Sequence, residues 1–164
     1  RKQDIERHPD GFWTLHITPE AGAVKGAMPR TAPLHDHLIE QGLIEFVRKA
    51  KDGPLFYDPN AKRKTGSDDP LNPTRPPYVL MRQKLGDWVR GLGVTDKSAS
   101  PNHAWRHTFK RRAAKAKIEE RIRDAFCGHT DPKVGRLYEI PDIEELAEAI
   151  KAFPRYEIDP PKQP

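Results

Sequence analysis

The spacing of apolar residues changes once along this chain, and that change restricts the folds it can adopt. Residues 12–17 form an aromatic and β-branched run after the turn signal Asp10-Gly11, which predicts a β-strand. Residues 31–34 can form the return strand, with Pro33 at an edge or a strand end because proline donates no ladder hydrogen bond. Beyond this hairpin, apolar residues recur at helical spacing. The pattern predicts an α+β fold that is mostly α-helical, with a small N-terminal β-hairpin or sheet packed on a helical core.

The helical part divides into several segments. We expect a helix from residue 36 with a break at Gly42, and further helices over 79–92, 102–117, 119–126, from 131 onward, and 143–153. Asn102 is the expected N-cap of the third of these helices. Residues 55–57 are a short strand candidate, and residues 58–77 form a long loop rich in proline, glycine and polar residues, which we expect to be mobile. Residues 154–164 form a proline-rich tail.

Charge is distributed unevenly along the chain. The 164 residues carry a net charge of +5, from 29 basic and 24 acidic residues. Residues 103–123 contain eight Lys or Arg and two acids, a local charge of +6, whereas residues 139–164 contain seven acids and three bases, a local charge of −4. A stretch this basic favours a polyanionic partner. Two solvated helix faces of opposite charge are the alternative interpretation.

Composition limits the class of protein. The length fits one domain of ordinary size, although only 35% of the residues are apolar. Cys127 is the single cysteine, so no intrachain disulfide can form, which fits a reducing cytoplasm. No apolar run approaches the length of a membrane span, and no signal-peptide core follows the N-terminus. We therefore expect a cytoplasmic protein that does not enter a membrane, and the absence of an initiator Met suggests a fragment of something longer.

The segment His103-Ala-Trp-Arg106-His107 combines two imidazoles with a guanidinium. On a helix, His103 and Arg106 are three residues apart and share a face. A guanidinium fork matches two phosphate oxygens at once, and an imidazole beside it can donate to a third oxygen or to a leaving oxygen. A capping histidine beside a solvated arginine is the structural alternative.

Three further residues complete a possible phosphodiester site. Gly128 can adopt a left-handed turn that directs His129 away from a helix end. Tyr138 offers a phenol, of which only about one molecule in a thousand is ionised at pH 7, so a nucleophilic role requires nearby cations or a base. Lys25, in a Gly- and Ala-rich hairpin, can protonate a leaving oxygen if the hairpin tip reaches DNA. Taken singly, a core tyrosine, a loop histidine and a solvated lysine are the ordinary interpretations.

Zinc binding is a weaker interpretation of the same region. Cys127, His129, His103 and His107 supply four potential ligands. The Cys-x-His spacing is tighter than in common zinc modules, and the chain has no Cys-x-x-Cys pair. We therefore expect no metal site.

In their order and spacing these signals resemble the catalytic domain of tyrosine recombinases, the phage-integrase family. The resemblance is carried by Lys25, by Thr31-Ala-Pro-Leu-His35, by His103-x-x-Arg106-His107, by Gly128-His129 and by Tyr138, and it spans roughly residues 10–153. It implies the DNA breaking–rejoining fold for residues 1–153. It also implies site-specific DNA recombination by the integrase of a phage or mobile element, with a chromosome-resolving recombinase as the other option.

The resemblance implies a role for each site residue. Tyr138 would attack a DNA phosphodiester, forming a 3′-phosphotyrosine and releasing a 5′-hydroxyl, without metal, ATP or another cofactor. Arg106 and His129 would bind the phosphate, His103 would act as acid/base, and Lys25 would protonate the leaving oxygen. The expected DNA-binding residues are Lys25, Arg106, His107, Lys110 and Arg111. The partners implied are double-stranded DNA and, for the full-length protein, three further copies in a tetramer on DNA.

One part of the family pattern is not found in this sequence. The family places another catalytic arginine on a helix before the first hairpin, and a DNA-binding domain before that. We expect both to precede residue 1, since Arg1 and Arg7 lie too close to the hairpin. The 164-residue chain would then be a partial catalytic domain that is inactive or weakly active alone.

Two other classes of function stay open. The chain could be a non-catalytic DNA-binding module that uses residues 103–123 for phosphate contacts only. It could also be an interaction module, because the apolar face of residues 143–153 could dock on another subunit. Packing of that face within its own domain is the simpler interpretation.

Overall fold

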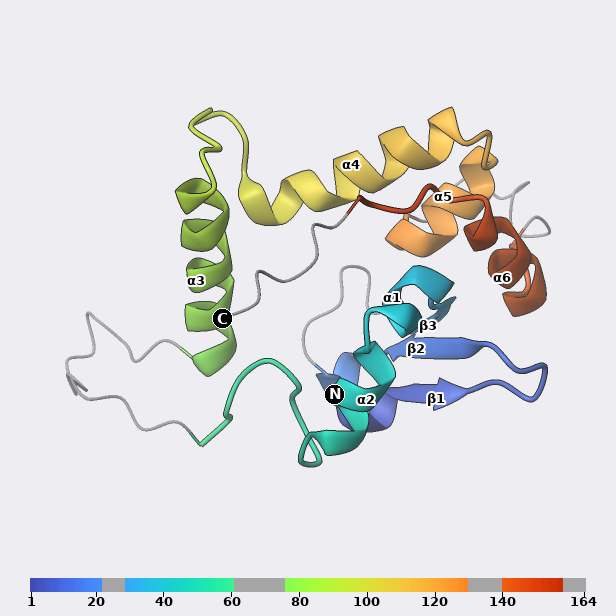
Figure 1. Cartoon of the computed structure of the whole chain (residues 1–164), viewed down its shortest axis with the longest axis horizontal. Helices are drawn as coiled ribbons and strands as arrows, with labels where there is room; N and C mark the ends of the chain where they lie inside the picture. Colours follow the sequence, from blue (N-terminus) through green and yellow to red (C-terminus); the bar gives the residue numbers. More distant parts are fainter. Residues whose placement is uncertain (22–28, 61–75, 130–139, 158–164) are drawn as a thin grey trace.

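The computed structural model describes residues 1–21, 29–60, 76–129 and 140–157 of the chain (Figure 1). Within these ranges it contains six α-helices and one three-stranded antiparallel sheet. The sheet is formed by the N-terminal part of the chain and the helices by the rest. The predicted α+β class, mostly helical with a small N-terminal sheet, is therefore confirmed.

The sheet contains one strand more than the predicted hairpin. Strands β1 (Ile5–Arg7), β2 (Trp13–Ile17) and β3 (Arg30–Pro33) are antiparallel in the order β1-β2-β3. Pro33 ends β3, which is an edge strand, as its missing N–H requires. No local pattern predicts β1, because its three residues are mostly polar and form a strand only by pairing with β2. A short 3-10 helix, η2 (Pro19–Ala21), follows β2.

The helix expected from residue 36 is two short helices, α1 (Asp36–Glu40) and α2 (Leu43–Lys49). Gly42 separates them in a left-handed conformation with φ 86°, which a residue with a Cβ adopts only at a cost. The break expected at Gly42 is thus confirmed. The strand expected over 55–57 is wrong: the backbone bends there, and Phe56 is 64% exposed and stacks on Phe46 instead of joining the sheet.

Helix α3 (Pro77–Gly91) and helix α4 (Pro101–Lys115) pack against each other. Both begin with proline at the first helical position, where its missing N–H costs nothing. For α4 this places the N-cap at Ser100, so the expected N-cap at Asn102 is wrong. Asn102 instead donates through Nδ2 to the Arg82 carbonyl of α3, 3.0 Å away. Most of the loop expected over 58–77 lies outside the described residues.

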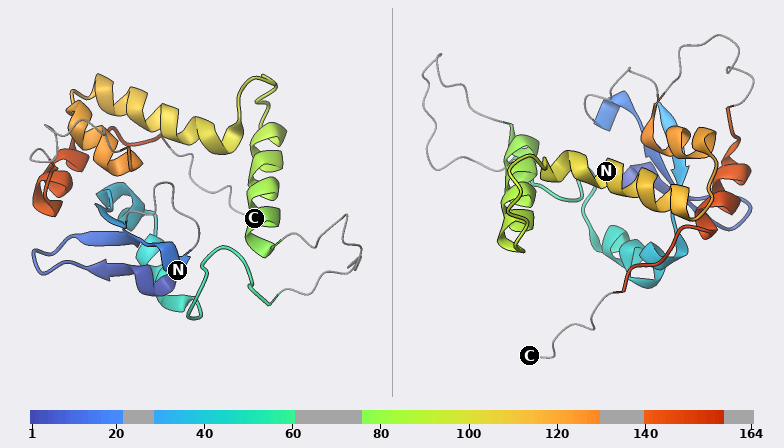
Figure 2. Two further views of the ribbon diagram at one scale, coloured as in Figure 1. Left: turned by 180° about the vertical axis from the view of Figure 1, so that it is seen from behind. Right: turned by 90° about the horizontal axis from the view of Figure 1, so that it is seen from above.

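The buried core lies where α4, α5 (Glu120–Cys127) and α6 (Ile143–Lys151) meet. Its central residues are Ala113, Ile118, Ile122 and Leu146, none more than 6% exposed. Figure 2 shows that α3 lies at one end of α4, while α5 and α6 lie at the other. Strand β3 contacts α6, and this contact joins the sheet to the helical core.

Several polar contacts hold α6 and the segment after it in place. Asp142 caps α6 by accepting from the Glu145 N–H at 2.7 Å, and the guanidinium of Arg121 on α5 binds the carboxylate of Glu145 with two hydrogen bonds. Beyond α6, His35 Nε2 lies 2.9 Å from the Phe153 carbonyl oxygen. The apolar face of α6 is covered by its own domain, since Leu146, Ala147 and Ile150 are each no more than 7% exposed.

Two expected elements lie wholly or mostly outside the described residues. The helix expected from residue 131 lies outside the described residues, as does most of the proline-rich tail, of which 154–157 are described. None of the helices in the described ranges combines the length and apolarity that a membrane span requires.

The 3-10 helix η1 (Lys2–Asp4) gives a prediction about acid stability. Arg1 donates to both carboxylate oxygens of Asp4, at 2.9 and 2.7 Å, and these bonds lower the pKa of the buried Asp4 to about 2. Because the pKa is about 4 in the unfolded chain, the stabilisation is fully present above pH 4 and is lost as the pH falls toward 2. We expect Asp4→Asn to remove about 1 kcal/mol of this pH-dependent stability, since Arg1 is partly screened by solvent.

Urea unfolding at pH 7 and pH 3 measures the effect. The wild-type chain should lose more stability between these two pH values than Asp4→Asn does. Equal losses in the two proteins would show that Asp4 is not the titrating group.

Candidate functional site

The end of helix α5 is shaped by Gly128. This residue has φ 64°, and its N–H donates to the Ala125 carbonyl at 3.1 Å. The next N–H, that of His129, donates to the Asp124 carbonyl at 2.9 Å. This left-handed turn ends the helix and directs the chain at His129 away from its axis. The helix end predicted from Gly128 is confirmed.

Arg106 connects α4 with this helix end. Its Nη1 donates to the Cys127 carbonyl oxygen. The last carbonyls of a helix have no partner within it and carry the negative end of the helix dipole, so a guanidinium is stabilised there. Arg106 and His129 therefore both lie at the same end of α5, although they are well separated in sequence.

Asp124 binds two other predicted site residues. Its Oδ1 lies 2.6 Å from Lys110 Nζ and 3.5 Å from His129 Nδ1. Lys110, expected to contact DNA, is thus held by a protein carboxylate, whereas the His129 side chain is 38% exposed. Asp124 therefore lies beside the His129 imidazole, part of which stays open to a ligand.

The remaining predicted residues of α4 lie on or near its surface. His103 and His107 are exposed, with ring centroids 4.9 Å apart and planes at 74°. His103 is one helical turn before Arg106, and Arg111 is exposed on the next turn after it. Tyr138 and Lys25 lie outside the described residues, so the structure does not place the expected nucleophile or the expected proton donor.

Arg30 is a member of this site that sequence reasoning missed. It opens β3, and a Cβ built on Gly128 would lie 2.6 Å from Arg30 Nη1 and 2.7 Å from Arg30 Cζ. The guanidinium therefore packs directly on the Gly128 backbone. The only sequence signal was its position immediately before Thr31, within a motif already singled out for its Pro-Leu-His residues.

The charges around Cys127 make this helix end electropositive. Burial raises the pKa of the Cys127 thiol, while Arg106, Lys110 and Arg30 act to lower it and Asp124 acts to raise it. The buried thiol is thus surrounded by three cations and one carboxylate. It is protonated at neutral pH, and the surplus positive charge suits an anion at this site.

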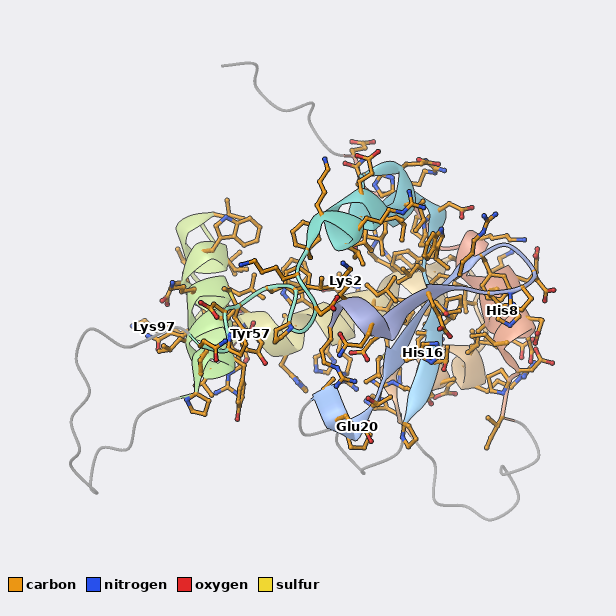
Figure 3. The ribbon with its side chains drawn as sticks, turned by 90° about the horizontal axis from the view of Figure 1, so that it is seen from below. Lys2, His8, His16, Glu20, Tyr57 and Lys97 are labelled. Atoms are coloured by element: carbon orange, nitrogen blue, oxygen red, sulfur yellow. The ribbon has the colours of Figure 1, made fainter. Side chains whose placement is uncertain are left out.

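Another part of the surface groups three side chains that can bind metals. Among the described residues, the ligand atoms of His8, Asp10 and Glu144 lie within 4.8 Å of one another. Figure 3 shows His8 beside α6, and its ring stacks on Phe12 at 4.4 Å. The Asp10 N–H donates to His8 Nδ1 at 3.3 Å, and His8 Nε2 faces Glu144 at 3.9 Å, so both ring nitrogens already have neighbours. We assign no metal to this group.

Gly128→Ala is expected to destabilise the protein in two ways. A Cβ at φ 64° is strained by about 1–2 kcal/mol, and it would also collide with the Arg30 guanidinium. We expect a total loss of about 2–3 kcal/mol in the free energy of unfolding, measured with urea.

Gly42→Ala is the matched control. Gly42 is also left-handed, at φ 86°, but a Cβ there meets nothing within 4 Å. The loss in the free energy of unfolding of Gly42→Ala should therefore come from backbone strain alone. Equal losses in the two variants would mean that the Arg30 guanidinium, at the end of a flexible side chain, moves aside without cost and that the collision contributes nothing.

Comparison with known proteins adds no relative. No protein-family model, no curated protein and no solved structure matches this chain. Its function is therefore inferred from its own residues and from the motif resemblance.

Proposed function

We propose that this chain is part of the catalytic domain of a tyrosine recombinase, the integrase of a phage or mobile element, and that it acts on double-stranded DNA. The observation that carries the proposal is that Arg106 and His129 both lie at the electropositive end of α5. These are the two phosphate-binding residues that the motif resemblance names; one lies on α4 and the other follows the end of α5. A partly open site with surplus positive charge suits a DNA phosphodiester.

In the proposed reaction, the phosphate lies against Arg106 and His129. The phenol oxygen of Tyr138 attacks the phosphorus, His103 accepts the phenol proton, and a 3′-phosphotyrosine forms as the bond to the 5′-oxygen breaks. Lys25 protonates that oxygen, which leaves as a hydroxyl. A 5′-hydroxyl from a partner strand then attacks the phosphotyrosine, which rejoins the DNA and restores the tyrosine.

A non-catalytic DNA-binding module is the second candidate. It is favoured by the engagement of Arg106 with a helix carbonyl and of Lys110 with Asp124, contacts that a purely structural role explains. Such a module would bind DNA with an affinity that falls steeply with salt, but it would never become covalently attached.

Covalent capture of DNA tests the proposal. The gene product that contains this chain, extended upstream to include the expected second arginine, is incubated with duplexes whose central sequence is randomised. The reaction is stopped with detergent, and protein that stays attached to DNA is measured. We expect attachment by the extended protein and little or none by residues 1–164 alone. Salt-sensitive binding with no attachment by the extended protein would favour the non-catalytic module.

A further inference from the structure

Two guanidinium groups meet at consecutive residues of the α5 end. Arg106 of α4 donates to the Cys127 carbonyl, and Arg30 of β3 packs on Gly128. The positive charge of Arg106 acts against the charged form of Arg30. A negative group bound by both guanidiniums would therefore stabilise the arrangement beyond the carbonyl that Arg106 already binds.

Arg30 has an unmet hydrogen-bonding requirement. Its Nε is buried and has no acceptor, although buried donors in proteins almost always have a partner. Within the described residues no carboxylate forms an ion pair with Arg30, and Asp124, the carboxylate that acts on Cys127, is already bound to Lys110. Burial, and after it the positive charge of Arg106, lower the pKa of Arg30, which is the direction expected for an uncompensated pair of cations.

A tetrahedral oxyanion matches this arrangement. A guanidinium presents parallel N–H donors that bind two oxygens of one phosphate, and two guanidiniums can share its remaining oxygens. A carboxylate carries its acceptor sites on two oxygens in one plane, whereas a phosphate presents oxygens in several directions, so two guanidiniums that approach from different elements suit a phosphate better.

We propose that Arg30 and Arg106 together hold one phosphate group at the end of α5. The inference deepens the proposed function and rests on it for the source of the phosphate, which would be a phosphodiester of DNA. Arg30 is then a phosphate ligand supplied by the strand that follows the hairpin, while Arg106 is supplied by α4. Free inorganic phosphate has the same chemistry and is the other possible source.

The first experiment uses free phosphate and the 164-residue chain. The amide signals of Gly128 and His129 are followed by NMR during a titration with sodium phosphate, with sodium chloride adjusted to keep ionic strength constant. We expect saturable shifts in the wild-type chain and at least a tenfold weaker apparent affinity in Arg30→Gln. The matched control, Arg155→Gln, removes an arginine that is paired with Glu40 and should leave the affinity unchanged.

Arg30→Lys tests whether a loss of phosphate affinity is caused by a folding defect. Lysine keeps the charge but lacks the fork and the Nε, so it should bind phosphate more weakly than arginine does while the chain unfolds at the same temperature. If the affinity for phosphate is the same in the wild-type chain, Arg30→Gln and Arg30→Lys, the proposal is overturned.

The second experiment uses a duplex of random sequence and measures how noncovalent affinity depends on salt. Each phosphate neutralised contributes about 0.9 to the slope of log affinity against log salt. If Arg30 and Arg106 share one phosphate, Arg30→Gln, Arg106→Gln and the double variant should each lose about one unit of slope. A loss of about two units in the double variant would mean two separate phosphates and would contradict the shared site.

The phosphate titration and the covalent capture experiment together separate this inference from the proposed function. If both arginines bind phosphate but the extended protein never attaches to DNA, the shared phosphate site stands and the recombinase proposal fails. If the extended protein attaches to DNA and Arg30→Gln binds phosphate as the wild-type chain does, the recombinase proposal stands and the shared site fails.

Discussion

Tyr138→Phe is expected to abolish covalent attachment to DNA in the upstream-extended protein. Phenylalanine has no oxygen to form the phosphotyrosine bond, so the loss should reach the detection limit, about 10³-fold or more. Noncovalent binding should change by less than about twofold, because the positively charged groups of α4 and β3 are untouched. Capture on the randomised duplex pool measures the first quantity, and fluorescence anisotropy without detergent measures the second.

Tyr78→Phe is the matched control. Tyr78 lies at the start of α3 with 57% of its surface exposed, so loss of its hydroxyl should alter neither capture nor binding. If Tyr138→Phe still becomes attached to DNA, the nucleophile is another residue and the proposed chemistry is wrong at its central step.

Arg106→Ala is expected to lower the rate of covalent capture by about 10²–10³. This is the usual cost of removing one preorganised donor from a site where negative charge develops in the transition state. Because Arg106 also donates to the Cys127 carbonyl, we expect about 1 kcal/mol of lost stability as well. Arg106→Lys should recover less than half of the lost rate on a logarithmic scale, since an ammonium cannot bind two oxygens at once.

Rate and stability are separated by measuring both on each variant. Arg155→Ala is the control: it removes a surface ion pair with Glu40 and should keep the capture rate within about twofold. If Arg106→Ala lowers stability while its capture rate stays within threefold of wild type, Arg106 only caps α5 and is not part of the reaction.

Local signals in the sequence predicted most element boundaries. The run over 12–17 gave a strand that begins one residue later, at Trp13. Gly42 and Gly128 marked breaks that the structure has, because each adopts a positive φ that other residues adopt only with strain. The errors fell where local pattern and tertiary contact disagree: residues 55–57 have strand-like composition but no partner strand, and β1 has little strand pattern but pairs with β2.

The candidate site was predicted only in part, because local sequence patterns indicate some of its residues and tertiary contacts bring in others. His103, Arg106 and His129 were found because each belongs to a short motif with its own chemistry. Arg30 was missed, since an arginine beside a strand has no distinctive local pattern, and its importance depends on what packs against it.

The sequence by itself determined that α5 ends at Gly128 and that Arg106 lies on the helix before it, because backbone strain and helical spacing act between neighbours in the chain. Only the tertiary structure decided that Arg30 of β3 and Arg106 of α4 converge on the Cys127–Gly128 peptide. That convergence follows from β3 packing on α6 and from α4, α5 and α6 sharing one buried core. Packing between distant segments depends on complementary surfaces formed only after folding, and no spacing within a single segment encodes it.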